Sequence, residues 1–159
     1  MSDAGERLLA VDLGLRTGLA VYGRDGRLVW YRSRNYGTRG RLRKAARSVI
    51  MEADPVSVVA IEGGGDIAVP WQAEIERRGL RSLQFQAEAW REDLLLSRHQ
   101  RSGLDAKKHA DILARRIIDW SGAKKPTSLR HDAAEAICLG LWAIHQLGWL
   151  PSYPGELRM

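Results

Sequence analysis

Four carboxylates at three places in the chain are the residues best suited to chemistry. Asp12 and Glu62 each end an apolar stretch, and Asp132 and Glu135 are three residues apart, so that on a helix they share one face. Four acids in one cluster repel one another, and oxygen ligands favour hard divalent cations such as Mg²⁺ or Mn²⁺. Two such ions roughly 4 Å apart can clamp the attacking water and the leaving oxygen of a phosphodiester.

Each acid also has an ordinary structural explanation. Asp12 can form a turn with the glycine that follows at position 14, and Glu62, before three glycines, can be a solvated strand end. Asp132 can cap a helix, with Glu135 as the acid of a capping box. These explanations stay open for the single residues, whereas the occurrence of all four acids together favours a shared site.

The segments that carry the acids predict a central sheet. Strand patterns occur over residues 8–12, 18–22, 27–32, 56–62 and 81–86. The first three are joined by short turns, which predicts an antiparallel meander with Leu28 and Trp30 on one face of its third strand. The fourth, VSVVAIE, is a near-continuous apolar run, typical of a strand covered on both faces. If the first and fourth strands are parallel neighbours, Asp12 and Glu62 meet at one edge of the sheet.

Helical patterns account for most of the remaining chain: residues 41–53, 69–78, 87–96, 106–120 and 131–147. Asp105 is expected to cap the fourth of these helices. The order of elements predicts one α/β domain over residues 1–150, with a mixed five-stranded sheet, three antiparallel strands followed by parallel ones, flanked by helices. Residues 151–159 are expected to form an irregular tail.

The composition is that of a basic globular protein. The 159 residues carry a net charge of +6, which favours a polyanionic partner such as nucleic acid. No apolar run approaches the roughly 20 residues of a membrane helix, and the polar start MSDAGER lacks the apolar stretch of a signal peptide. We therefore expect an intracellular protein, cytoplasmic or associated with the nucleoid. Cys138, Trp90, Trp120 and Trp142 fall in apolar helical patterns and are expected to pack in the core.

Four stretches together resemble the RuvC-like Holliday junction resolvases of the ribonuclease H-like superfamily, which include the chloroplast-type resolvases. They are VDLGLRTGLAVY, VVAIEGGG, AWREDLL followed by AKKHA, and HDAAEAICLGLWA. The resemblance covers residues 8–142 and implies a ribonuclease H-like fold. It matches the metal-binding, catalytic acids of that family to Asp12, Glu62, Asp132 and Glu135. Glu135 stands where bacterial resolvases usually have Asp, which is closer to the chloroplast type.

The same resemblance implies basic groups near the scissile phosphate. Arg91 and Lys107 match such positions, where they would neutralise charge that develops on the phosphate. We also expect DNA contacts from Lys108, which follows Lys107 on the polar side of its helix, and from Arg101 in an exposed loop. Trp71, close to the glycine loop, is the tryptophan we expect to stack on DNA.

These expectations describe a structure-selective endonuclease that resolves four-way DNA junctions with two Mg²⁺ ions per active site, for which Mn²⁺ can substitute. Asp12 would bridge the two ions, Glu62 and Asp132 would complete one each, and Glu135 would help to hold the second. Symmetric cutting of a junction needs two active sites, which predicts a twofold homodimer.

Two alternatives stay open at the level of the sequence. One is a related RuvC-like nuclease that acts on RNA or RNA–DNA hybrids, as in ribosomal RNA processing. The other is a nucleic-acid-binding module without catalytic activity, against which the presence of all four acids argues. Cleavage of junction, flap, duplex and hybrid substrates would separate them.

Overall fold

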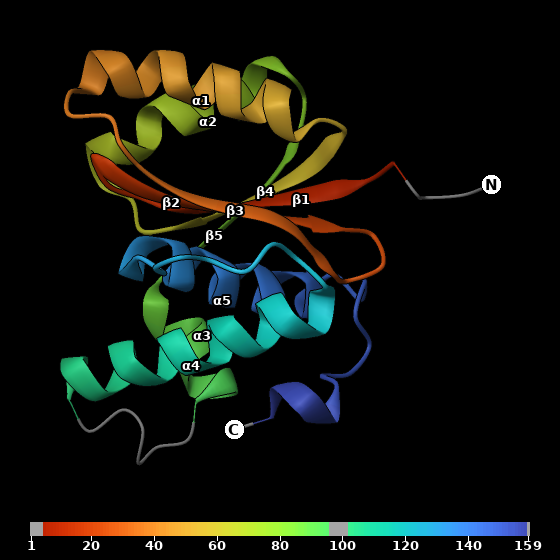
Figure 1. Cartoon of the computed structure of the whole chain (residues 1–159). Coiled ribbons are helices and arrows are strands. Elements are labelled where there is room, and N and C mark those ends of the chain that lie inside the picture. Colours follow the sequence, from red (N-terminus) through yellow and green to blue (C-terminus); the bar gives the residue numbers. More distant parts are fainter. Residues whose placement is uncertain (1–4, 96–101, 159) are drawn as a thin grey trace.

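A five-stranded sheet forms the centre of the molecule, with helices on both of its faces (Figure 1). The computed structural model describes residues 5–95 and 102–158. The strands are β1 (Arg7–Asp12), β2 (Arg16–Gly23), β3 (Leu28–Asn35), β4 (Val56–Glu62) and β5 (Arg81–Phe85). The helices are α1 (Arg39–Ala53), α2 (Val69–Arg77), α3 (Ala87–Leu94), α4 (Gly103–Ser121) and α5 (His131–Gln146), with 3₁₀ turns η1 (Gly65–Ala68) and η3 (Gly155–Leu157).

The strands lie in the order β3-β2-β1-β4-β5. β1 pairs antiparallel with β2, and β2 with β3, whereas β4 runs parallel to both β1 and β5. The predicted α/β class and the predicted sequence of antiparallel and then parallel strands are therefore confirmed. A mixed sheet of this order with helices on both faces is consistent with a ribonuclease H-like arrangement.

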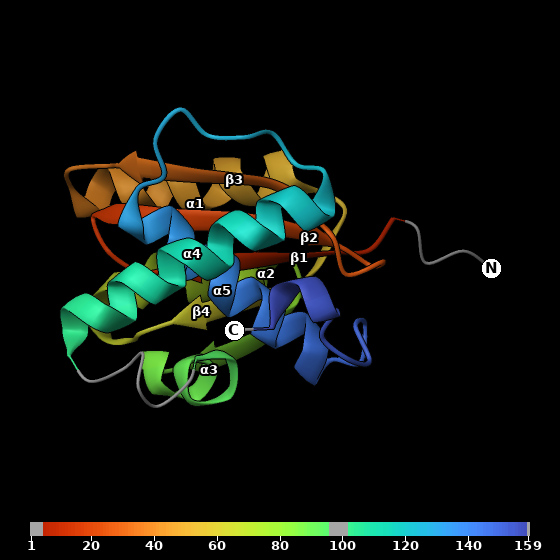
Figure 2. The ribbon, with the colours of Figure 1, turned by 60° about the horizontal axis from the view of Figure 1, so that its bottom comes forward.

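Small residues on one face of the sheet allow α5 to pack closely against it. α5 lies directly on the sheet and α4 lies outside α5, as the two views in Figures 1 and 2 show. A Cβ added to Gly140 of α5 would lie 2.2 Å from the ring of Tyr22 in β2, so no larger residue fits there. The Tyr22 hydroxyl donates to the Ile137 carbonyl at 2.5 Å. The helix that carries Asp132 and Glu135 is thus fixed on the sheet along its length.

β3 contains an irregularity that the sequence pattern does not reveal. Leu28 pairs with Tyr22 and Trp30 pairs with Val21, so one extra residue lies between the two pairs. Leu28 therefore packs on the side of α5, and Trp30 on the side of α1. The expectation that both share one face is wrong, because a bulge reverses the alternation of side chains. β3 also continues beyond its predicted end and includes Ser33.

Two boundaries near the C-terminal half differ from the expectations. α4 begins at Gly103, and Ser102 is its N-cap, accepting a hydrogen bond from the Asp105 amide at 3.1 Å. Asp105 thus lies in the first turn of the helix and does not cap it. Beyond residue 150 the chain is not wholly irregular, because η3 forms one turn and Leu157 is buried in the core. Within the described residues, no helix has both the length and the hydrophobicity to cross a membrane.

Candidate functional site

Asp12 and Glu62 lie side by side where two parallel strands end. They are register partners at the ends of β1 and β4, and the Leu13 amide donates to the Glu62 carbonyl at 3.2 Å, which extends the pairing by one step. Two residues before each acid, Ala10 in β1 and Ala60 in β4 pack in the core on the side of α5. Because side chains alternate along a strand, the two carboxyl groups also point toward α5.

The N-terminus of α5 supplies the other two acids. Asp132 lies in its first turn, and Glu135 follows one turn later. β2 approaches this turn so closely that a Cβ added to Gly18 would lie 1.8 Å from the Asp132 carbonyl oxygen. Ser33, the register partner of Gly18 on β3, donates its hydroxyl to Asp132 Oδ2 at 2.9 Å. β2 and β3 therefore fix the position of this end of the helix.

The two buried acids, Glu62 and Glu135, receive hydrogen bonds from α3. Trp90 donates its indole N–H to Glu62 Oε1 at 2.5 Å. Arg91 Nη2 lies 2.7 Å from Glu135 Oε1, and His131 Nε2 lies 3.1 Å from the same oxygen. The other oxygen, Glu135 Oε2, is buried and has no hydrogen-bond partner among the described residues. An orphaned carboxylate oxygen in the interior is costly, because it has lost its hydration without replacement.

The acids act on one another electrostatically. Burial raises the pKa of Asp12 to about 9, and the neighbouring carboxylates, Glu62 foremost, act in the same direction. Burial also raises the pKa of Glu135 to about 7, together with the charge of Glu62 and against the opposing effect of Arg91. Negative charge is therefore disfavoured at this place unless positive charge is added to it.

The donor set suits a hard divalent cation by its chemistry. In the part of the chain that the structure describes, no group of three or more His, Cys, Asp or Glu side chains is arranged to hold a metal ion as it stands. Four carboxylates that repel one another and one buried, unpartnered oxygen are nevertheless the features that a cation would compensate. The residues present thus fit the expected group, Mg²⁺ or Mn²⁺, as oxygen ligands.

Of the basic residues predicted to contact DNA, Arg91 touches an acid of the site, whereas Lys107 and Lys108 are exposed on α4. Burial lowers the pKa of His131, and the charge of Lys107 acts in the same direction; it also lowers the pKa of Glu135, so Lys107 is close enough to act on the site electrostatically. Arg91 contacts Glu135 directly. Lys108 is exposed on α4, one residue further along the helix. The acids and the first two basic residues therefore belong to one site.

The expectation that Trp71 stacks on DNA is wrong. Trp71 is fully buried in the core between the sheet and the helices α1 and α2. Its ring has no exposed face on which a base could stack. Arg101, the other predicted loop contact, lies outside the described residues.

Two polar contacts of the site were not predicted from the sequence, namely Trp90 to Glu62 and Ser33 to Asp132. Trp90 was expected in the core, where it does pack, but its indole N–H had no assigned partner. A signal for the second contact was Gly18, a glycine inside a strand of apolar residues, which indicates a close approach of another segment.

Trp90→Phe is expected to lower the stability of the protein by about 1–3 kcal/mol, because it keeps a buried ring but leaves Glu62 without its donor. The matched control is Trp71→Phe. Trp71 is equally buried and loses the same ring volume, but its indole nitrogen has no hydrogen-bond partner within the described structure, so its replacement should cost less stability than that of Trp90. Urea denaturation measures both variants. Equal destabilisation would contradict a specific role of the Trp90 hydrogen bond.

The comparisons with known proteins identify no family. No family model and no curated protein matches the chain. Among solved structures, it is similar to the cryoEM structure of a simian T-cell lymphotropic virus intasome in complex with PP2A regulatory subunit B56 gamma, at 10% sequence identity and a TM-score of 0.36. The match covers 98% of this chain and 60% of that chain. At this level of similarity the comparison supports no inference about function.

Proposed function

We propose that this protein is a structure-selective endonuclease that hydrolyses phosphodiester bonds of branched DNA, with the four-way junction as its main substrate. The observation that carries the proposal is the convergence of Asp12, Glu62, Asp132 and Glu135 from three distant segments. A turn, a strand end or a helix cap explains each acid alone but not their common location. The net charge of +6 and the resemblance of four stretches to RuvC-like resolvases support a nucleic acid as the substrate.

The cofactor that we propose is Mg²⁺, two ions per site, with Mn²⁺ as a substitute. The four acids would hold the ions, which supply Lewis-acid chemistry for phosphodiester hydrolysis. Trp90 and Ser33 orient two of the acids through their hydrogen bonds. Arg91 and Lys107 place positive charge beside the acids, where it can stabilise the charge of a bound phosphate.

We further propose that the protein acts as a twofold homodimer. A four-way junction presents two equivalent strands, and cutting both symmetrically requires two copies of the site. On this proposal the protein acts on DNA inside the cell, in the cytoplasm or at the nucleoid. Sedimentation of the protein with and without a junction measures its oligomeric state.

A substrate panel tests the proposed function. Labelled four-way junction, flap, duplex and RNA–DNA hybrid are incubated with the wild type in Mg²⁺, Mn²⁺ or Ca²⁺. We expect paired, symmetric nicks in the junction with Mg²⁺ or Mn²⁺, and binding without cleavage in Ca²⁺. Cleavage confined to the hybrid would replace the proposal by a ribonuclease activity, and junction binding without cleavage in any of the three ions would indicate a binding module.

A further inference from the structure

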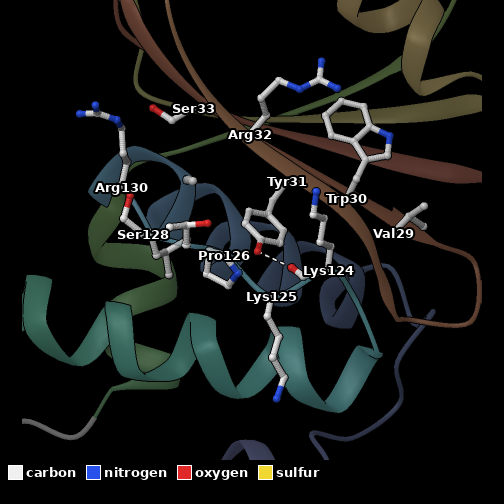
Figure 3. A pocket seen from close by; sticks show the side chains of 13 residues that line it. Val29, Trp30, Tyr31, Arg32, Ser33, Lys124, Lys125, Pro126, Ser128 and Arg130 are labelled. Atoms are coloured by element: carbon white, nitrogen blue, oxygen red, sulfur yellow. Dashed lines mark hydrogen bonds between the residues drawn. The ribbon is translucent and has the colours of Figure 1, made fainter.

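A groove lies beside the acids, between β3 and the loop of residues 122–130 that joins α4 to α5 (Figure 3). Its volume is about 420 Å³. Residues 29–33 line one wall, and residues 124–130 line the other. Ser33 lines the groove and also donates its hydroxyl to Asp132. The groove is therefore directly continuous with the acid cluster.

The groove keeps its shape through contacts of the protein itself. The Tyr31 hydroxyl donates to the backbone carbonyl of Lys124 at 2.5 Å, which ties the loop to the edge strand (Figure 3). Arg32 is bound by both oxygens of Glu52, at 2.7 and 2.8 Å, and its guanidinium lies 4.5 Å from the ring centre of Trp30. The charge of Arg32 is thus compensated within the protein, and its role in the wall is structural.

The remaining lining is cationic and rich in hydroxyl groups. Among the residues that line the groove, all of which the structure describes, none is acidic. The side chain of Lys125 points away from the groove in Figure 3, and its ammonium lies 3.8 Å from Asp119. Lys124 and Arg130 stand at opposite ends of the loop wall, both exposed, with Ser128 between them. Separated cations with hydroxyl donors between them suit successive phosphates of one strand.

We propose that this groove holds the sugar–phosphate backbone of one nucleic acid strand on one side of the phosphodiester at the acid cluster, with Lys124 and Arg130 contacting phosphates. The inference rests on the proposed function and specifies the path of the substrate. Ser33 contacts Asp132 and lines the groove, so the groove offers a path for a strand that presents one phosphodiester to Asp132. Its volume is that of a small-ligand pocket, so a single strand fits it and a duplex does not.

The test uses the full chain with Asp12→Asn, which prevents cleavage, and the double replacement Lys124→Ala with Arg130→Ala. The probes are a fluorescent single-stranded oligodeoxynucleotide and a four-way junction, titrated at several salt concentrations. Loss of two phosphate contacts should make the slope of log affinity against log salt less negative by about 1.4 for the single strand. The fold should persist, because Tyr31 bonds the backbone of Lys124 and not its side chain.

The matched control is the double replacement Arg43→Ala with Lys44→Ala, which removes the same charge from the exposed side of α1, on the other face of the sheet. We expect its salt slope to stay within about 0.5 of the parent value. The slope reports the number of phosphates that the protein contacts, and on our proposal Arg43 and Lys44 contact none. Equal changes in the two double variants, or no change in the groove variant, would overturn the inference.

The two proposals can fail separately. If the wild type cuts no member of the substrate panel but the groove variant still shows the selective loss of slope, the nuclease proposal is refuted and the groove remains a strand-binding site. If the wild type cuts junctions but the groove variant binds like the control, the groove inference is refuted and the nuclease proposal stands.

Discussion

Asp12→Asn is expected to lower the rate of junction cleavage by at least about 10³-fold and, at the same time, to raise the melting temperature of the metal-free protein. Asparagine keeps the shape of the side chain but removes the charge that a divalent cation needs. That charge is unfavourable in the folded protein without a cation, since burial and the other acids raise the pKa of Asp12 to about 9. Loss of activity together with a gain of stability is typical of a functional site and not of a structural residue.

The pH dependence of this effect follows from the direction of the pKa shift. Because the pKa of Asp12 is higher in the folded state than its ordinary value of 3.8, the folded protein binds this proton more tightly than the unfolded chain. The resulting stabilisation is complete below about pH 3.8 and is lost as the pH rises through about 9. At pH 7 the free energy of unfolding of Asp12→Asn is expected to exceed that of the wild type by roughly 4 kcal/mol, and this difference should shrink as the pH falls.

Thermal melting monitored by circular dichroism, between about pH 5 and about pH 9 and with a chelator present, measures this difference. Added Mg²⁺ should raise the melting temperature of the wild type and leave that of Asp12→Asn nearly unchanged. Asp66→Asn is the matched control, because the Asp66 side chain is 79% exposed and its ion pair is with an exposed arginine, Arg39. An Asp12→Asn variant that melts below the wild type without metal, or that gains as much stability from Mg²⁺, would contradict the interpretation.

The part of the fold that depends on hydrophobic periodicity could be predicted from the sequence. The run VSVVAIE occupies β4 with the predicted bounds, because a strand buried on both faces has an unambiguous pattern. The sequence predicted that Asp12 and Glu62 meet if β1 and β4 are parallel neighbours, and the structure pairs the two strands in this way. The bulge in β3 could not be predicted, because one extra residue in a half-exposed strand leaves no mark on the pattern of residue types.

The site itself was only partly accessible from the sequence. The acids could be selected by their chemistry, but their hydrogen-bond donors are distant in the sequence. Trp90 is 28 positions from Glu62, and Ser33 is 99 positions from Asp132. Trp71 was assigned to the surface because a glycine loop precedes it in the chain, whereas the inward face of α2 buries it. The groove has walls from β3 and from a loop about 100 residues later, and neither wall has a periodic pattern.

Gly18→Ala is expected to lower both the stability of the protein and its rate of cleavage, although Gly18 has no side chain to contribute. The added Cβ would lie 1.8 Å from the Asp132 carbonyl oxygen, 2.3 Å from its carbon and 3.0 Å from the Ala133 nitrogen. All three are backbone atoms, so no side chain can rotate aside, and the first turn of α5 has to move away from β2. Further along the helix, the contact of Gly140 with Tyr22 prevents a compensating shift of the whole helix.

The expected result for Gly18→Ala is therefore a displaced N-terminus of α5, with Asp132 separated from Ser33 and from the acids on the sheet. A misplacement of about 1 Å can reduce a rate by about 10²-fold, and we expect a loss of at least that size when cleavage is measured well below the melting temperature. Gly103→Ala is the matched control, since no atom of the described residues lies within 4 Å of its added Cβ and alanine favours the helix it begins. Wild-type cleavage by Gly18→Ala would show that the position of Asp132 does not limit the reaction, whereas lost cleavage with a retained fold would assign to Gly18 the placement of the acids on α5.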